Sequence, residues 1–324
     1  MRLVTVTKNE AGQRLDKLMF KYMNLAGKSF IYKMIRKKNI TLNGKKCDGS
    51  EKLAEGDEIR LFLAEETIEK FSEVKIQKVK KTALDIVYED KDVIFINKPA
   101  GMLSQKAKDS DESLVEYLID YLLGSGQLSR EELKSFRPSV CNRLDRNTSG
   151  LVAAGKSLLG LQVLSKAIKE RTIGKYYLCI VKGVIDSPRR IQGWLLKNEK
   201  TNQVTVTKQR REDSLPIETE YVPMASDGHY TLLKVKLITG RSHQIRAHLA
   251  SIGHPIIGDT KYGDPRENLA AKKKYGVSCQ LLHAALLVLP EELPEELSRL
   301  RGMEVSAPLP DVFAAFAGQL QGGR

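Results

Sequence analysis

The sequence predicts a mixed α+β protein with a largely antiparallel sheet, preceded by a small unit of two helices and short strands. Apolar residues at helical spacing dominate before residue 40, and short strand-like stretches follow them. After residue 85, strands and helices recur without the strict alternation of a doubly wound parallel sheet. With 324 residues, of which 41% are hydrophobic, the chain can form two packed cores. We therefore expect an N-terminal domain, residues 1–63, and a larger domain, residues 83–324.

The N-terminal domain is predicted from two apolar stripes that Gly27 separates. Each stripe repeats at the three- and four-residue spacing of one helix face. Their members are Leu15, Leu18, Met19 and Tyr22, then Phe30, Ile31, Met34 and Ile35. Two short strands should follow, Ile40–Leu42 and Ile59–Leu63, and the Asn43-Gly44 pair after the first one favours a tight hairpin turn.

Basic residues are concentrated in this first domain. The whole chain carries 53 lysines and arginines against 40 acidic residues, a net charge of +13. Residues 14–46 contain ten basic residues and a single acid, Asp16, so ion pairs along the helix faces cannot balance them. Such an excess favours a polyanionic partner, with nucleic acid ahead of an anionic membrane surface. The alternative is an ordinary solvated helix face.

Residues 64–82 are charged and lack a clear period, which is typical of a linker. The larger domain then opens with a predicted hairpin whose turn is Glu89–Asp92. Amphipathic helices are expected at 112–123 and 157–171, and strands at 176–181 and 231–239.

Neither membrane insertion nor export is predicted. The charge-free apolar run at 281–290 is half the length needed to cross a bilayer, and the first residues lack the apolar core of a signal peptide. The four cysteines are scattered without a C-x-x-C pair, as expected for reduced thiols of a cytoplasmic protein, and they offer no zinc site.

The densest polar cluster is the segment CNRLDRNTSG, residues 141–150. Its carboxylate, Asp145, lies between Arg143 and Arg146, and neighbouring guanidinium groups should keep it ionised. An ionised carboxylate suits a nucleophile or an electrostatic stabiliser better than a general acid. A salt bridge in a surface loop is the alternative for a string of this kind.

A second cluster, LITGRSHQIRAHL at residues 237–249, follows a predicted strand and opens a predicted helix. Its Arg241, His243, Arg246 and His248 would face an anion near the helix N-terminus. The two histidines diverge by about 140° around a helix, so they do not share a face as a metal pair would. No H-E-x-x-H motif occurs, and we expect no metal.

These strings resemble two known families. The segment QRLDKLMFKYMN, followed by KSFIYKMIRKKNITLNGKK, resembles the α-L motif, a small RNA-binding module first described in a ribosomal small-subunit protein. INKPAGMLS, NRLDRNTSGLVAAGKS, KYYLCIVKG, LITGRSHQIRAHLASIGHPIIGDTKYG and LLHA occur in the order and spacing of RluA-family pseudouridine synthases. This second resemblance covers nearly all of residues 85–315 and implies the pseudouridine synthase fold for the larger domain.

The resemblance to pseudouridine synthases implies a set of roles. Asp145 matches the catalytic aspartate, which either attacks the sugar of the target uridine or assists cleavage of its glycosidic bond. Tyr177 matches the active-site tyrosine that packs against the base and is a candidate for removing the proton from carbon 5. Arg246 matches the basic partner of the aspartate, and Arg143 the arginine that helps to fill the space of the flipped nucleotide. Asn142 stands where many relatives have His, which we expect to alter an RNA contact rather than the chemistry.

The resemblance also implies the partners. The substrate is expected to be uridine in structured RNA, first of all large-subunit ribosomal RNA and next transfer RNA, and the rearrangement needs no cofactor. The residues expected to contact RNA are Arg143, Arg14, Lys33, Arg36, Lys37, Arg241 and His243. We expect a monomer. Two alternatives stay open, a non-catalytic RNA-binding or ribosome-assembly factor and a nucleoside hydrolase.

Overall fold

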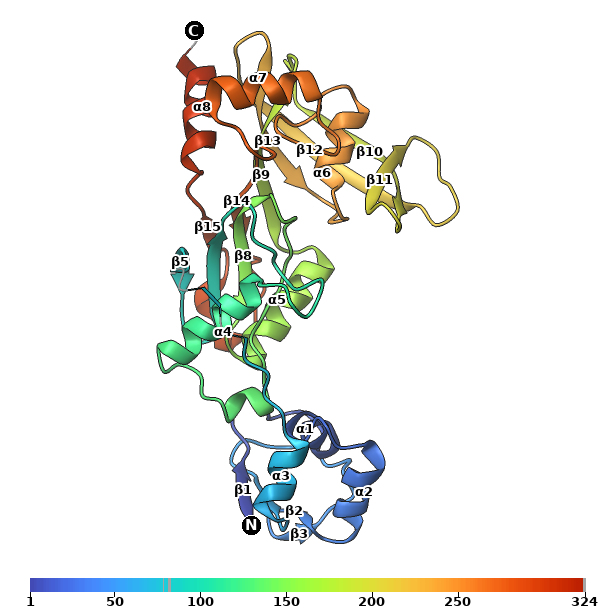
Figure 1. The fold of residues 1–324 in the computed structure, drawn as a ribbon, viewed down its shortest axis with the longest axis vertical. Coiled ribbons are helices and arrows are strands. Elements are labelled where there is room, and N and C mark those ends of the chain that lie inside the picture. The colour runs from blue at the N-terminus through green and yellow to red at the C-terminus, as the bar shows by residue number, and fades with distance from the viewer. Residues whose placement is uncertain (78, 81–82, 323–324) are drawn as a thin grey trace.

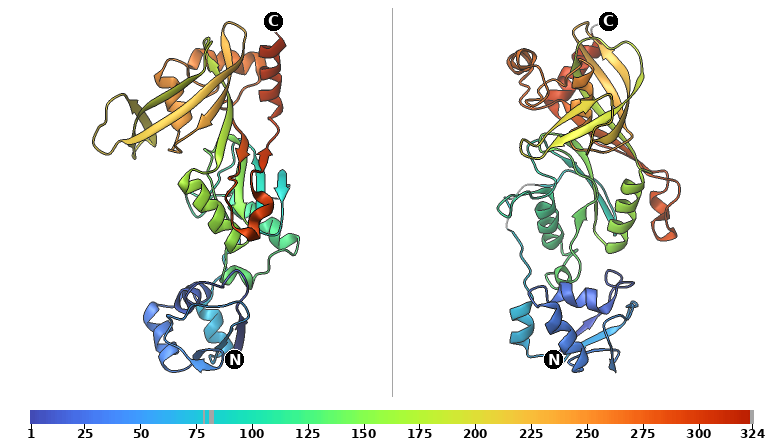
Figure 2. Two further views of the ribbon diagram at one scale, coloured as in Figure 1. Left: turned by 180° about the vertical axis from the view of Figure 1, so that it is seen from behind. Right: turned by 90° about the vertical axis from the view of Figure 1, so that its right-hand side faces the viewer.

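The computed structural model of the protein describes residues 1–77, 79–80 and 83–322. The molecule is elongated, with a small N-terminal unit at one end and a large sheet running from the middle to the other end (Figures 1 and 2). None of the helices in the described part has the length and apolar character of a membrane span.

The N-terminal unit combines two amphipathic helices with a four-stranded antiparallel sheet. Helices α1, Leu15–Tyr22, and α2, Lys28–Arg36, carry the two predicted apolar stripes and turn them into one core. Its strands are β1 (Arg2–Thr5), β2 (Ile40–Leu42), β3 (Lys45–Lys46) and β4 (Glu58–Leu61), in the order β1-β4-β2-β3. The predicted helices and first strand are confirmed, whereas β1 and β3 were not predicted and β4 ends earlier than expected. Asn43 and Gly44 adopt positive φ angles of 50° and 72°, as the two-residue turn between β2 and β3 requires.

The predicted linker is partly helical, which corrects the expectation from its charge. Helix α3, Glu65–Phe71, occupies its beginning, and Ile68 is completely buried in the N-terminal core. The Phe71 ring also packs on Phe30, with ring centroids 4.7 Å apart. These two apolar residues are enough to dock α3 on the N-terminal core. Two apolar residues in seven are too few to show a helical period in the sequence. Residues 78, 81 and 82 of the predicted linker lie outside the described residues.

A sheet of eleven strands forms the larger unit as far as the structure describes it. Its order is β11-β10-β12-β13-β9-β14-β8-β6-β5, with β15 paired to β14 and β7 to β8. The strands are β5 (Ile86–Glu89), β6 (Val93–Lys98), β7 (Ser139–Val140), β8 (Ser149–Gly155), β9 (Gly174–Lys182), β10 (Arg189–Asn198), β11 (Gln203–Thr207), β12 (Leu215–Ser226), β13 (Tyr230–Leu237), β14 (Leu282–Val288) and β15 (Glu304–Ser306). Strands β8 and β14 pair in parallel, and the other described pairs of this sheet are antiparallel. The predicted α+β class with a largely antiparallel sheet is confirmed.

Helices cover both faces of this sheet. They are α4 (Leu114–Gly124), α5 (Leu158–Glu170), α6 (Gln244–Ser251), α7 (Pro265–Tyr275) and α8 (Asp311–Gly322), with 3₁₀ turns at Glu132–Lys134 and Glu295–Leu300. Alternate residues of β6 and β8 divide between two cores, one containing α4 and α6 and the other containing α5. At the far end, α7 and α8 cover β9 and β13. The loop before β8, the strand β9 and the start of α6 therefore meet on one face.

Polar contacts join the N-terminal unit to the larger one. The Ser135 hydroxyl donates to the Glu10 carboxylate, 2.5 Å, and the Leu158 N–H donates to the Asn9 side chain, 2.9 Å. The Tyr22 hydroxyl donates to a carboxylate after α4. These contacts attach α1 and its neighbours to the end of the larger unit that carries α5 (Figure 2).

Candidate active site

The segment that carries Asp145 is a loop between β7 and β8, fastened to the sheet by an amide. The Asn142 side chain donates to the Leu151 carbonyl, 3.1 Å, and accepts from the Ala153 N–H, 2.8 Å. These are the two kinds of bond that a primary amide can make at once. Asn142 therefore braces the loop against β8, and its expected effect on an RNA contact stays a prediction.

The end of the loop is fixed by a close approach of two strands. Gly150 has a φ of 109° and pairs with Ala284 of β14, where an added Cβ would lie 2.3 Å from the Ala284 carbonyl oxygen. Glycine is therefore required at this position. Just before it, the buried Thr148 hydroxyl accepts from the Gln280 amide, 3.2 Å. Asp145 is thus presented from a loop with little freedom on either side.

A buried lysine supports the same loop from β6. Lys98 is fully buried, and its ammonium donates to the carbonyls of Pro99, Met102 and Arg146 at 2.9, 2.8 and 3.2 Å. Burial lowers the pKa of Lys98 to about 8, although the nearby Asp145 carboxylate acts in the opposite direction. Lys98 therefore ties the β6 end to the residue that follows Asp145 and places a cation behind the carboxylate.

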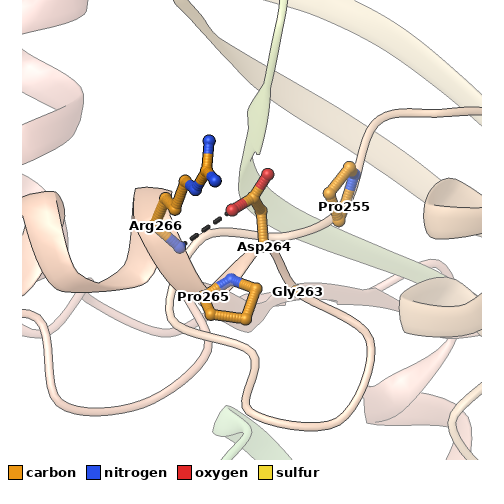
Figure 3. A pocket seen from close by; sticks show the side chains of 5 residues that line it. All are labelled: Pro255, Gly263, Asp264, Pro265 and Arg266. Atoms are coloured by element: carbon orange, nitrogen blue, oxygen red, sulfur yellow. Dashed lines mark hydrogen bonds between the residues drawn. The ribbon is translucent and has the colours of Figure 1, made fainter.

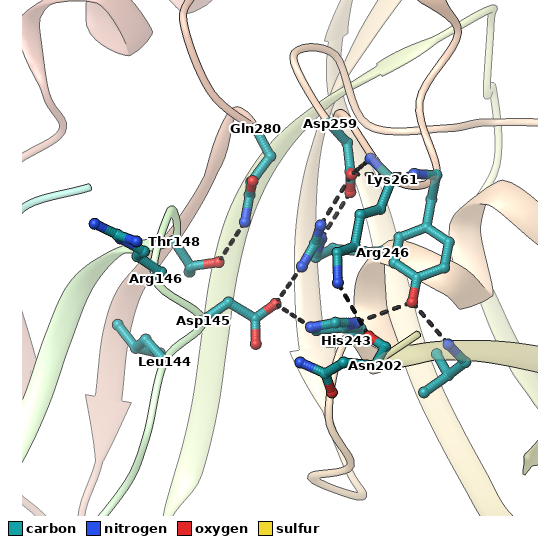
Figure 4. A network of polar contacts seen from close by, with 12 residues as sticks. Leu144, Asp145, Arg146, Thr148, Asn202, His243, Arg246, Asp259, Lys261 and Gln280 are labelled. Atoms are coloured by element: carbon teal, nitrogen blue, oxygen red, sulfur yellow. Dashed lines mark hydrogen bonds and ion pairs between the residues drawn. The ribbon is translucent and has the colours of Figure 1, made fainter. Parts of the chain in front are cut away.

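The Asp145 carboxylate is held by an arginine that is itself held by a second aspartate (Figure 4). Arg246 on α6 donates from Nη1 to Asp145 Oδ2, 2.7 Å, and from Nε and Nη2 to the two oxygens of Asp259, 2.7 and 2.9 Å. The side chains of Arg246 and Asp259 are 6% and 0% exposed, whereas that of Asp145 is 26% exposed. The bidentate pair with Asp259 fixes the orientation of the Arg246 guanidinium. Its remaining donor, Nη1, is thereby directed at Asp145.

The two buried members of this group keep their charges. Burial opposes ionisation of Asp259, but the hydrogen bonds from Arg246 outweigh it and hold the pKa of Asp259 below its ordinary value. Burial likewise opposes the charge on Arg246, yet Asp259 and Asp145 raise the pKa of the guanidinium. Two carboxylates share one guanidinium, so Asp145, Arg246 and Asp259 sum to one negative charge, which the Lys98 ammonium partly offsets.

His243 and Tyr177 lie beside the carboxylate. The His243 Nε2 is 3.9 Å from Asp145 Oδ2, and burial lowers the pKa of the imidazole. Tyr177 on β9 is buried, and burial together with the Asp145 charge raises the pKa of its hydroxyl well above the ordinary value. Among the described residues, the neighbour that acts on the Tyr177 hydroxyl is the Asp145 carboxylate, through its charge. The raised pKa keeps the phenol protonated at neutral pH.

A hollow of about 530 Å³ lies at the start of α7 and shares no lining residue with the group around Asp145. Its walls are Pro255, Gly263, Asp264, Pro265 and Arg266 (Figure 3). The Asp264 carboxylate already accepts from the Arg266 N–H, 2.9 Å, and pairs with a lysine of β9. The helix N-terminus is thus capped by the chain's own carboxylate.

Comparison with known proteins decides the family. Residues 92–251 match the model of the RNA pseudouridylate synthase family, and residues 13–59 match the S4 domain. The ribosomal large subunit pseudouridine synthase C of Vibrio vulnificus is 30% identical over 313 residues, covering 95% of this chain and 93% of that protein. The chain belongs to the RNA pseudouridylate synthase family.

Other relatives agree with this assignment. The pseudouridine synthase C of Escherichia coli K12 is 30% identical over 304 residues, or 93% of this chain and 92% of the relative. A solved structure, named Human RNA Pseudouridylate Synthase Domain Containing 4, has the same fold, with a TM-score of 0.58 and 22% sequence identity. The match covers 73% of this chain and 92% of the human chain. This pseudouridine synthase is therefore an isomerase, as the resemblance implied. The family assignment favours neither of the two alternatives, a non-catalytic RNA-binding factor and a nucleoside hydrolase.

The structure brings some predicted site residues together and leaves others apart. The pairing of Arg246 with Asp145 that the resemblance implied is present, and Tyr177 and His243 lie in the same place. Arg143 is exposed on the loop. Arg241 is half-buried before α6, and its Nε has no hydrogen-bond partner among the described residues.

Four predicted RNA contacts belong to the N-terminal unit. Lys33, Arg36 and Lys37 are exposed on or just after α2 of this pseudouridine synthase. Arg14 is half-exposed and pairs with Asp16, with Nη2 2.8 Å from Oδ2. The contacts of all four with RNA stay predictions.

Sequence reasoning missed three residues of the site. They are Asp259, Lys98 and Tyr262, whose hydroxyl lies 2.9 Å from His243 Nδ1. All three lie within strings that resemble the family, but nothing local assigned them a role. Asp259 is recognised only through its bidentate contact with Arg246, and Lys98 only through its three carbonyl partners. The one usable signal was the GDTKYG string, in which an acid and an aromatic hydroxyl follow a buried apolar segment.

Proposed function

We propose that this pseudouridine synthase isomerises specific uridines of large-subunit ribosomal RNA to pseudouridine, with Asp145 as the catalytic carboxylate. Relatives that match over nearly their whole length are named ribosomal large subunit pseudouridine synthase C, which supports the choice of RNA. The observation that carries the catalytic assignment is the unequal use of the two Asp145 oxygens. Oδ2 is bound by Arg246, whereas no described residue forms a hydrogen bond with Oδ1.

This arrangement suits chemistry at the sugar of a uridine. An ionised carboxylate with one free oxygen can attack the anomeric carbon or stabilise the cation that forms as the glycosidic bond breaks. Because Arg246 is fixed by Asp259, it orients Asp145 without neutralising the whole group. A uridine that is flipped out of folded RNA would meet Oδ1 first.

Tyr177 is proposed to pack against the uracil ring. Its hydroxyl is protonated at neutral pH because burial and Asp145 raise its pKa. A protonated phenol can accept the carbon-5 proton only if it passes its own proton to another acceptor. The packing role therefore needs nothing further, whereas the proton-removal role needs a second base.

The rest of the chain is proposed to bind the RNA. The N-terminal domain, residues 1–63, would place Arg14, Lys33, Arg36 and Lys37 on the phosphate backbone of structured RNA, which positions the enzyme without reading sequence. Residues 83–324 would form the catalytic domain, in which exposed Arg143 fills the space of the flipped nucleotide and Arg241 contacts a phosphate. We propose a cytoplasmic monomer.

Pseudouridine mapping on unmodified transcripts tests this proposal. The enzyme is incubated separately with large-subunit ribosomal RNA, small-subunit ribosomal RNA and transfer RNA, and pseudouridine is mapped by carbodiimide-dependent stops of primer extension. We expect new stops in the large-subunit transcript alone, and none with folded Asp145→Asn protein. Stops only in transfer RNA would refute the proposed substrate, and stops with Asp145→Asn would refute the proposed catalytic residue.

A further inference from the structure

His243 lies in a chain of polar groups that connects a hairpin to the carboxylate. Its Nδ1 is 2.9 Å from the Tyr262 hydroxyl. Its Nε2 faces Asp145 Oδ2 at 3.9 Å (Figure 4). The imidazole is 10% exposed and follows a backbone φ of 53° at the start of α6. Both ends of the ring thus have a defined neighbour.

The Tyr262 hydroxyl determines which ring nitrogen carries the proton. It accepts the N–H of Val204 on β11, 2.9 Å, and a backbone N–H can only donate. Among the described residues, Nδ1 of His243 is the one acceptor in hydrogen-bond contact with this hydroxyl. The hydroxyl therefore donates to Nδ1, which leaves the imidazole proton on Nε2. The opposite tautomer would direct the Nε2 lone pair at the Asp145 carboxylate, which is electrostatically unfavourable.

The surroundings favour a neutral imidazole. Burial lowers the pKa of His243, and nearby cations act in the same direction, while nearby carboxylates oppose them. The charged groups that face the ring are Asp145, Arg246, Lys261 and Asp259. The net shift is downward, so at neutral pH the ring has one donor and one acceptor.

We propose that His243 is a positioning residue for Asp145, fixed as the Nε2–H tautomer by Tyr262, and that Tyr262 links this geometry to the β10–β11 hairpin. The inference rests on the proposed function, since it assigns the orientation of the proposed catalytic carboxylate. In this arrangement His243 directs an N–H dipole at Asp145 and leaves the Arg246 contact undisturbed. A role as a direct RNA contact, predicted from the sequence, uses none of these features.

The hairpin is attached to the site by two neighbouring residues. Tyr262 holds Val204 at the start of β11, and the Lys261 ammonium donates to the Asn202 carbonyl in the turn, 3.1 Å. The hairpin itself carries two exposed lysines, Lys197, which pairs with Glu199, and Lys200 in the turn, and both lie where they can contact phosphates. RNA seated on the hairpin would therefore hold the Tyr262 and His243 contacts in place when the uridine reaches Asp145.

The tautomer can be measured without any RNA. The chain has five histidines, so long-range ¹H–¹⁵N spectra of ¹⁵N-histidine-labelled protein resolve each ring, and His243→Gln assigns the relevant signal. At pH 7 we expect a neutral His243 with its proton on Nε2, and a mixture of tautomers in Tyr262→Phe. Tyr275→Phe, which removes a hydroxyl outside this group, is the matched control and should leave the signal unchanged. A wild-type ring protonated on Nδ1, or a signal unaffected by Tyr262→Phe, would overturn the inference.

Kinetics then separate positioning from folding. Tyr262→Phe keeps the ring that lies 5.2 Å from the Arg246 guanidinium, so packing is preserved. We expect the single-turnover rate to fall about tenfold, with RNA affinity nearly unchanged. The glutamine of His243→Gln still offers an N–H to Asp145. When Tyr262→Phe is added to this variant, the single-turnover rate should show no comparable further loss. An equal loss in both backgrounds would refute the link, whereas an inactive wild type on ribosomal RNA would refute the proposed function and leave the tautomer result standing.

Discussion

Asp16 and Asp145 are each paired with an arginine, and the two pairs differ in which partner is buried. In the N-terminal unit, the Asp16 side chain is 3% exposed and that of Arg14 is 52% exposed. At the active site the order is reversed, because Arg246 is 6% and Asp145 26% exposed. The sequence shows each aspartate within an R-L-D string, so the string alone does not distinguish them.

The hydrogen bonds explain what this difference means. Both Asp16 oxygens are occupied, Oδ1 by Arg14 Nε at 3.1 Å and Oδ2 by Arg14 Nη2 and the Tyr32 hydroxyl, each at 2.8 Å. Asp145 has one occupied oxygen and one to which no described residue forms a hydrogen bond, and its side chain is partly exposed. A fully satisfied carboxylate stabilises a fold, whereas a half-satisfied one on a rigid support can react.

The sharpest contrast is expected from the same substitution at both sites. Asp145→Asn should lower turnover more than about 10³-fold, because the amide cannot supply the anionic oxygen. Asp16→Asn should leave turnover on the same transcript within a few-fold and instead lower the melting temperature by several degrees. Turnover and thermal melting, measured on both variants, check this. Similar turnover in the two variants would remove the distinction between the pairs.

Asp259→Asn tests whether the buried partner of Arg246 orients the catalytic carboxylate. The neutral amide removes one of the two negative charges that face the buried Arg246 guanidinium. The free energy of unfolding should therefore fall by about 3–5 kcal/mol. Turnover should fall roughly 10–100-fold, as for partners that orient a reacting group. Asp264→Asn on the neighbouring turn is the matched control, because asparagine also caps a helix. Urea unfolding and initial rates measure both effects, and equal losses in the control would contradict the role of Asp259.

The basic face of the N-terminal unit should affect binding rather than chemistry. Replacing Lys33, Arg36 and Lys37 with Ala should flatten the slope of log affinity against log salt by roughly two to three units, since each phosphate contact contributes about 0.7–0.9. The single-turnover rate at saturating enzyme should change little. The control replaces three basic residues of α7 with Ala, and so removes the same charge from another surface. They are Lys272, Lys273 and Lys274. An unchanged slope would mean that α2 presents its lysines only to solvent.

Lys98 predicts a small dependence of stability on pH. Its pKa is lowered to about 8 in the folded protein, against 10.5 for an ordinary lysine, so between these values the unfolded chain binds more protons. Stability therefore rises with pH in this window, by less than about 1.4 kcal/mol per unit. The difference in unfolding free energy between wild type and Lys98→Met should grow in favour of the wild type from pH 8 to 10. A constant or shrinking difference in urea titrations would contradict the lowered pKa.

The sequence predicted the parts of the fold that rest on local periodicity. Helices α1 and α2 follow from apolar residues three and four positions apart, and the turn at Asn43 and Gly44 follows from residues that tolerate positive φ. Helix α3 was missed because Ile68 and Phe71 are too few to form a stripe.

The site required information that no local pattern holds. Asp145 and Arg246 are 101 positions apart, and their pairing was expected only from the resemblance to a family. Lys98 ends an apolar strand, where a lysine ordinarily extends its ammonium to water. Its burial depends on carbonyls at positions 99, 102 and 146, which only the folded loop brings together.

A structure of the Asp145→Asn protein bound to its target RNA segment is the most direct test of the catalytic assignment. We expect a uridine flipped out of the RNA, with its sugar C1′ or uracil ring about 3–4 Å from the side chain at position 145. Arg246 should remain paired with Asp259, and Arg143 should occupy the space that the base has left. A uridine that stays stacked in the RNA, or one held away from position 145 on another surface, would contradict the role of Asp145.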